Sequence, residues 1–164
     1  GNIDTRINKV INGDLAGIVL AEAGLERMHL TEVMTERLPL DQFPSAAGQG
    51  AIAVVAKEDN DQIINLLRSI EDEASRAEIT AERSLVLKLE GGCRVPIGAV
   101  AVASGDKLTL TGTVYSLEGQ KKITAQATGA LSQAAELGAK VGAELIALGA
   151  EDFEKQWREK YGIW

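Results

Sequence analysis

The sequence predicts a mixed fold of α/β segments followed by an α+β domain. Three observations indicate this fold class. Within the first 70 residues, stretches with apolar residues at helical spacing alternate with short apolar runs, as in parallel α/β proteins. From residue 95 to residue 128, apolar residues instead alternate with polar ones, which is typical of half-buried strands. The helical spacing returns after residue 134, so helices are expected to follow the sheet.

The first elements are predicted as a helix, a strand and a second helix. Apolar residues recur at helical spacing over 3–11, and Gly13 just beyond them is typical of a helix C-terminus. The short apolar run 18–20 indicates a strand, and residues 23–28 indicate a helix directly after it. A strand, a turn and a helix in succession are typical of an α/β protein.

A glycine-rich segment, residues 45–50, precedes the next predicted strand. Its small, uncharged residues suit a hinge or a tight turn that brings the backbone close to a ligand. It lacks the third glycine of a dinucleotide fingerprint and precedes a strand, so it does not predict nucleotide binding. Residues 51–56 are continuously apolar, which predicts a buried parallel strand, and 59–70 carry a helical apolar stripe.

The rest of the chain predicts a self-sufficient α+β domain. Short turns join the predicted strands, which implies an antiparallel meander. One helix, three strands and two further helices are expected at 71–90, 95–103, 108–115, 123–128, 134–148 and 153–161.

Composition excludes several classes of function. The 164 residues carry 17 basic and 24 acidic side chains, and a net charge of −7 disfavours nucleic-acid or anionic-membrane binding. No apolar run approaches the ~20 residues of a membrane-spanning helix. One cysteine and one histidine exclude an internal disulfide and a usual structural zinc site, so no metal is expected. No signal-peptide pattern is present, and we expect a cytoplasmic protein.

Cys93 lies on a constrained loop between Gly91-Gly92 and Pro96. A free cysteine is usually buried and inert. Here the neighbouring glycines leave space around the sulfur, and Arg94 favours the thiolate. The residues alone leave open both an inert cysteine and a nucleophilic or covalently modified one.

Two arginines suggest an anion site. Arg6 lies in the first turn of its helix, where the dipole disfavours a cation, so it is either solvated or part of an anion site. Arg27 lies near the carboxyl end of the strand predicted at 18–20, where α/β sheets bind ligands. A salt bridge with a nearby glutamate is its alternative role. His29 is expected at the helix end, without a catalytic role.

Five segments carry the pattern of a known family: GNIDTRINKV, AEAGLERM, LPLDQFPSAAGQGAIAV, TAERSLVLKLEGGCRVPIGAVA and ELGAKVGAELIALGA. Through them the chain resembles the porphobilinogen deaminase family, also called hydroxymethylbilane synthases, over almost its whole length. The segments occur in the family's order and spacing, and LEGGCRVPIGA is highly specific.

The resemblance implies a three-domain transferase of porphyrin and tetrapyrrole biosynthesis, which leads to haem, chlorophyll and cobalamin. The family joins four porphobilinogen molecules head to tail into hydroxymethylbilane and releases ammonia. Its dipyrromethane cofactor is held by a thioether to one cysteine, which Cys93 matches. Its other cofactor-binding positions are matched by Arg6, Ala21, Gln49 and Gly50, and a substrate-binding position by Arg27.

The resemblance also implies that this chain is the C-terminal portion of a longer enzyme. The family's catalytic aspartate precedes the segment GNIDTR, so no catalytic residue is expected here and the chain alone is expected to be inactive. Porphobilinogen and polypyrrole intermediates are the expected partners. The intact enzyme is expected to be a monomer, and this chain to self-associate or to pair with the missing half.

By correspondence with the family, the chain divides into four parts. Residues 1–44 end the second domain and 45–50 are the hinge segment. Residues 51–70 return to the first domain, so both α/β parts are incomplete segments of a periplasmic-binding-protein-like fold. Residues 71–164 form the third domain, which bears the cofactor cysteine.

Two other functions compete with this interpretation. A non-catalytic α+β binding or regulatory module with an inert cysteine is opposed by LEGGCRVPIGA and by the two arginines. A cysteine-dependent acyl or thiol transferase is opposed by the lack of a candidate base.

Overall fold

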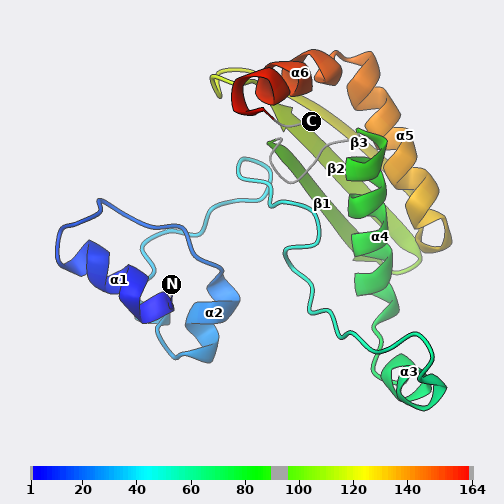
Figure 1. Cartoon of the computed structure of the whole chain (residues 1–164), viewed down its shortest axis with the longest axis horizontal. Coiled ribbons are helices and arrows are strands. Elements are labelled where there is room, and N and C mark those ends of the chain that lie inside the picture. The colour runs from blue at the N-terminus through cyan, green and yellow to red at the C-terminus, as the bar shows by residue number, and fades with distance from the viewer. Residues whose placement is uncertain (1, 90–95, 163–164) are drawn as a thin grey trace. The chain divides into compact units, whose positions relative to one another are not determined.

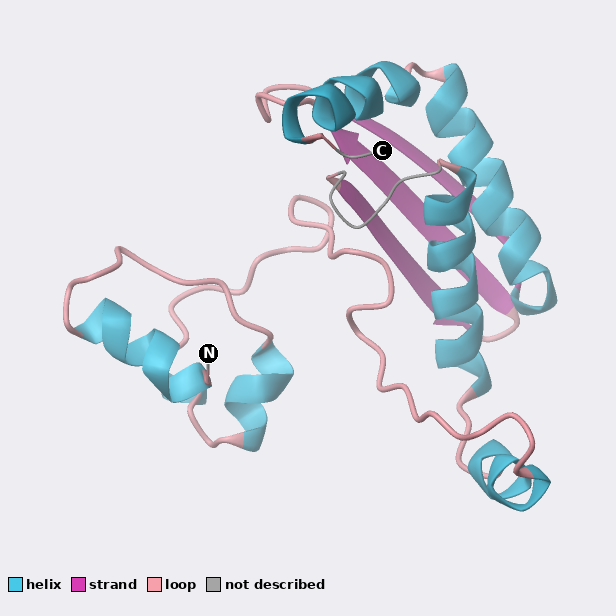
Figure 2. Ribbon diagram, viewed as in Figure 1, coloured by secondary structure: helices cyan, strands magenta, loops and turns pink. Residues whose placement is uncertain are grey.

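The computed structural model describes residues 2–89 and 96–162. The chain forms two compact units, Gly1–Leu38 and Pro39–Trp164, which differ in architecture (Figure 1). The first unit is helical, and the second combines helices with a three-stranded antiparallel sheet (Figure 2). The predicted mixed fold class is therefore confirmed. No helix in the described ranges is both long and apolar enough to cross a membrane.

The first unit contains helix α1 (Ile3–Ile11), helix α2 (Glu22–Arg27) and a 3-10 turn (Thr31–Val33). Both helices occur where the apolar spacing predicts them. Ile3 of α1 packs against Gly24 of α2 so closely that an added Cβ would lie 2.8 Å from its Cδ1. Leu25, with 5% of its surface exposed, is buried in this unit.

The two ends of these helices agree with the sequence analysis. Gly13 follows α1 with a φ of +79°, the left-handed conformation that glycine adopts without strain. His29 follows α2 with a φ of +55°, and its backbone N–H donates to the Glu26 carbonyl at 3.1 Å. His29 therefore lies at the helix end, as expected.

Two predicted strands are wrong. Residues 18–20 and 51–56 form no strand, and Val19 and Val55 expose 76% and 92% of their surface. A strand requires a neighbour for its backbone N–H and C=O groups. No described segment pairs with either run. The apolar pattern identified segments suited to burial, but a pattern does not supply the partner that buries them.

The second unit confirms the predicted order of helices, meander and helices. Its sheet has the order β1-β2-β3, with both strand pairs antiparallel. The elements are α3 (Asp61–Arg68), α4 (Glu73–Lys88), β1 (Ile97–Ser104), β2 (Lys107–Tyr115), β3 (Lys122–Ala130), a 3-10 turn (Leu131–Gln133), α5 (Ala134–Ala147) and α6 (Ala150–Tyr161).

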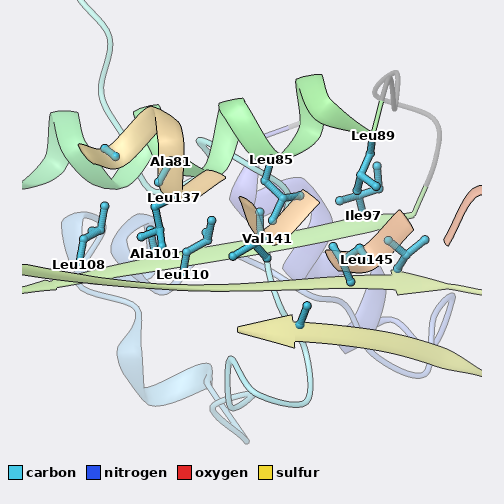
Figure 3. Packing of buried hydrophobic residues seen from close by; sticks show 14 of the residues in the cluster. Ala81, Leu85, Leu89, Ile97, Ala101, Leu108, Leu110, Leu137, Val141 and Leu145 are labelled. Carbon is cyan, nitrogen blue, oxygen red and sulfur yellow. The ribbon is translucent and has the colours of Figure 1, made fainter. Parts of the chain in front are cut away.

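Helices α4 and α5 cover one face of the sheet and form the core with it (Figures 1 and 3). Leu108 and Leu110 point from β2 toward the helices, as the period of two predicts. Leu85 of α4 meets Val141 and Leu145 of α5 above them, and all five side chains are fully buried. The period of two in the strands and the helical period of α4 and α5 thus bring apolar side chains into one core layer.

On the opposite face of the sheet, β2 and β3 carry polar side chains. Cross-strand hydrogen bonds join the hydroxyls of Thr109 and Thr128 at 3.0 Å and those of Thr113 and Thr124 at 3.1 Å. Each pair stands directly opposite in the register. These threonines therefore satisfy one another across the two strands.

Two glycines on α5 let this helix approach α4 closely. A Cβ at Gly138 would lie 2.3 Å from the Ala81 carbonyl oxygen, and one at Gly142 would lie 2.7 Å from the Lys88 Cβ. The first obstacle is backbone and cannot move aside. The two helices therefore pack at a separation that only glycine allows at position 138.

We predict that Gly138→Ala destabilises the second unit by about 1–3 kcal/mol, although alanine favours a helix by ~1 kcal/mol over glycine. Gly129→Ala is the matched control, because a Cβ there would meet Leu137 at an ordinary 3.5 Å. Urea unfolding measures both variants. Equal stabilities of the two variants would contradict the close approach of the helices.

A carboxylate caps the N-terminus of α4. The backbone N–H of Ser75 donates to the Asp72 side chain at 2.7 Å, and this bond holds the pKa of Asp72 below its ordinary value of 3.8. A carboxyl with a lowered pKa stabilises the fold fully above its unfolded-state pKa. That contribution is lost as pH falls below 3.8 through the lower folded-state value.

We predict that Asp72→Ala lowers the melting temperature at pH 7, and that the difference from the wild type shrinks as pH falls below about 3.8. Asp72→Asn is the control, because its amide oxygen caps the helix without titrating. Thermal unfolding at pH 7 and in acid measures all three proteins. A difference between wild type and Asp72→Ala that is independent of pH would refute the assignment.

Candidate functional site

Glu82 of α4 joins the glycine-rich segment to β1. The backbone N–H of Gly48 donates to Glu82 Oε2 at 2.7 Å, and the N–H of Ala101 donates to Glu82 Oε1 at 2.9 Å. Both bonds are partly buried. One carboxylate on a rigid helix thus holds two separate segments, and each of its oxygens accepts a charge-assisted hydrogen bond.

The same pattern extends along the outer edge of β1. The N–H of Ala103 donates to Glu78 Oε1 at 2.8 Å, and the N–H of Ala99 donates to the Ser45 carbonyl at 3.0 Å. Residues 99, 101 and 103 alternate along β1, and their backbone N–H groups point away from β2. An edge strand normally presents free donors to solvent. Here α4 and the glycine-rich segment satisfy them.

Two overlapping turns shape the glycine-rich segment. The N–H of Gln49 donates to the Ala46 carbonyl at 3.2 Å, and that of Ala51 donates to the Gly48 carbonyl at 3.3 Å. Gly48 has a φ of +76°, which favours glycine at this position. Gln49 and Gly50 lie exposed beyond this anchor, and no described atom lies within 4 Å of a Cβ built at Gly50.

Residues just before the glycine-rich segment are also fixed to the sheet. A Cβ at Gly98 would lie 2.5 Å from the Pro44 Cγ, so the proline ring occupies the space that a side chain would need. Tyr115 donates its hydroxyl to the Gln42 carbonyl at 3.4 Å, and Trp157 of α6 donates its indole N–H to the Tyr115 carbonyl at 3.2 Å. Residues 42–48 together therefore contact α4, β1 and β2.

The two candidate arginines lie on the helices of the first unit. Arg6 of α1 and Arg27 of α2 are exposed, and neither forms an ion pair within the described residues. Glu22, one of the glutamates expected near Arg27, instead accepts from Arg37 at 2.7 Å. This hydrogen bond raises the pKa of Arg37 above its ordinary value. Within the described residues, Arg27 and Arg6 thus have no carboxylate partner.

Two predicted site residues remain. Ala21 is the exposed N-cap of α2. Cys93 lies outside the described residues, so its surroundings stay a prediction. On either side of residues 90–95, Leu89 and Ile97 belong to the hydrophobic core and expose only 2% and 8% of their surface.

Residues 1–65 match the family model of the porphobilinogen deaminase dipyromethane cofactor binding domain, and residues 76–147 match that of the porphobilinogen deaminase C-terminal domain. The chain belongs to the porphobilinogen deaminase family. The resemblance inferred from the sequence motifs is thereby confirmed.

Curated relatives agree with this membership. The chain is 42% identical over 96% of its length to the porphobilinogen deaminase of Desulforamulus reducens, and 43% identical over 92% to that of Roseiflexus castenholzii. It is 42% identical over its whole length to a probable porphobilinogen deaminase of Nitrosopumilus maritimus. These alignments cover 51%, 50% and 52% of the relatives, so the chain spans about half their length.

Glu82 and Glu78 were not predicted from the sequence. Both follow directly after buried alanines of α4, Ala77 and Ala81, so they flank the face that packs on the sheet. Two glutamates four residues apart beside a stripe of small apolar residues were the available signal. Their partners, Gly48 and the β1 backbone, are distant in sequence and leave no local pattern.

We predict that Arg6→Ala and Arg27→Ala change the stability of the first unit by less than about 0.5 kcal/mol, because both side chains are exposed and unpaired within the described residues. Leu25→Ala, which removes a buried side chain, should destabilise α1 and α2 by about 2 kcal/mol or more. Amide hydrogen exchange of these helices measures each variant. If an arginine variant exchanges as fast as Leu25→Ala, that arginine is structural.

Proposed function

We propose that this chain serves in a hydroxymethylbilane synthase, a transferase that joins four porphobilinogen units with release of ammonia in tetrapyrrole biosynthesis. The observation that carries the proposal is identity of 42–43% to porphobilinogen deaminases over 92–100% of the chain. The dipyrromethane cofactor, when bound, supplies the pyrrole carbon to which the first substrate is joined. Cys93 is the proposed attachment point, through a thioether.

The chain's own residues are proposed to bind carboxylates. Porphobilinogen and the dipyrromethane carry acetate and propionate groups, and a guanidinium binds a carboxylate through two parallel hydrogen bonds. Arg6 for the cofactor and Arg27 for the substrate are exposed and carry no ion pair in the described structure, which supports these roles. Fixing the carboxylates orients the pyrroles, so that the reacting carbons meet.

Three further contacts are proposed for the cofactor. Ala21 and Gly50 act mainly through their backbone, and Gln49 through its amide side chain. Gly50 suits this role because its surroundings are open and its N–H has no hydrogen-bond partner within the described residues. A backbone donor held at the tip of a turn can approach a ligand more closely than a side chain allows.

We further propose the division into domains that the family correspondence implies. Residues 1–44 end a second domain, 45–50 form a hinge, 51–70 return to a first domain, and 71–164 form a third. Ile52 and Val55 expose 78% and 92% of their surface, which supports a partner polypeptide that covers the segment 51–56. Without that partner the chain, acting in the cytoplasm in this proposal, does not turn over substrate.

We predict that the purified chain does not consume porphobilinogen in an Ehrlich-reagent assay. If the chain carries a pyrrole adduct, the intact mass of the chain should exceed its sequence mass by one dipyrromethane. The added mass should map to Cys93 and should be missing from Cys93→Ala. Consumption of porphobilinogen by the chain alone would refute the proposed inactivity. A pyrrole attached to any other residue would refute the anchor.

A binding measurement tests the arginine assignment. Arg27→Ala should weaken porphobilinogen binding by about tenfold, the loss expected for one charge-assisted contact. Arg37→Ala is the matched control, because this exposed arginine of the same unit is already paired with Glu22. Equal affinities of the two variants would contradict a role for Arg27.

A further inference from the structure

Glu82 differs from its neighbour Glu78 in one respect. Both lie on α4 and accept a hydrogen bond from the outer edge of β1, at 2.9 Å from Ala101 and 2.8 Å from Ala103. Only Glu82 also accepts a bond from the glycine-rich segment, at 2.7 Å from the Gly48 N–H. The edge of β1 therefore has two carboxylate partners, and one of them, Glu82, also binds the glycine-rich segment.

The additional bond lies next to two candidate cofactor-binding residues. Gly48 immediately precedes Gln49 and Gly50, has a positive φ, and donates its N–H to Glu82 of α4. Beyond Gly48, the two exposed residues have no other tie to α4 or β1 in the described structure. The Gly48 anchor is therefore the last described contact with α4 or β1 before these two residues, and we expect it to influence the direction in which the turn presents them.

The chemistry of the anchor requires a carboxylate. Each oxygen of Glu82 accepts from a different N–H donor, so both must be acceptors at once. An amide has one acceptor oxygen, and its NH₂ group would face one of the two donors. Glu82→Gln therefore breaks one of the two bonds, whereas Glu82→Ala removes both acceptors.

We propose that Glu82 is the positioning residue that sets the orientation of the Gln49–Gly50 turn for ligand binding. The ligand in this inference is the pyrrole carboxylate of the proposed function, on which this part of the inference rests. Glu82 does not touch the ligand. It acts through Gly48, by fixing a glycine-rich turn to a helix that forms part of the core of the second unit.

The first experiment measures amide hydrogen exchange in the purified chain and does not depend on function. In Glu82→Ala, which removes both acceptors, exchange at Gly48 should accelerate at least tenfold, while the melting temperature stays close to that of Glu78→Ala. In Glu78→Ala, exchange at Ala103 should accelerate and exchange at Gly48 should not. Unchanged exchange at Gly48 in Glu82→Ala would overturn the proposal.

The second experiment titrates porphobilinogen into the wild type and both variants. Glu82→Ala should bind at least fivefold more weakly than Glu78→Ala, because only the first releases the turn. Equal affinities of the two variants would overturn the positioning role. If the wild type itself binds no porphobilinogen, the proposed function fails for this chain, and the Gly48 exchange rate still decides whether Glu82 fixes the turn.

Discussion

The second unit depends on helix α4, which is held on two sides by different kinds of interaction. One side buries Ala77, Ala81 and Leu85 against the sheet and α5, where hydrophobic burial and close packing fix its position. The adjoining flank carries Glu78 and Glu82, which satisfy donors that β1 would otherwise expose. The apolar face of α4 thus fixes the helix on the sheet, and this placement brings the two carboxylates to the edge of β1.

The family motifs acquire physical meaning from these contacts. The segment SAAGQG contains the left-handed Gly48, and PIGA contains Gly98, whose missing side chain leaves room for Pro44. Ser45 then reaches the β1 backbone at Ala99. Two motifs that are far apart in the sequence therefore form a single structural joint, and the candidate ligand contacts Gln49 and Gly50 extend from it.

Elements that depend on local pattern were predictable from the sequence. The meander followed from the alternation around Leu108 and Leu110 and from the short turns, and α5 followed from its helical stripe closed by Gly149. The strands expected at 18–20 and 51–56 failed because pairing is non-local: apolar residues favour burial, but the partner must come from elsewhere. The bonds of Glu82 were unpredictable for the same reason. The family motifs indicated the candidate site residues, while no local pattern showed which contacts hold Gln49 and Gly50 in place.

The contact between Pro44 and Gly98 also bears on how such sequences change over time. The proline ring fills the volume that any larger residue at position 98 would need, so position 98 cannot change while the ring at 44 is retained. A side chain becomes acceptable at 98 only after the ring at 44 is lost or displaced, and that displacement also disturbs the neighbouring Ser45. We therefore expect the two positions to covary among homologues. A side chain at position 98 should occur only where position 44 lacks proline.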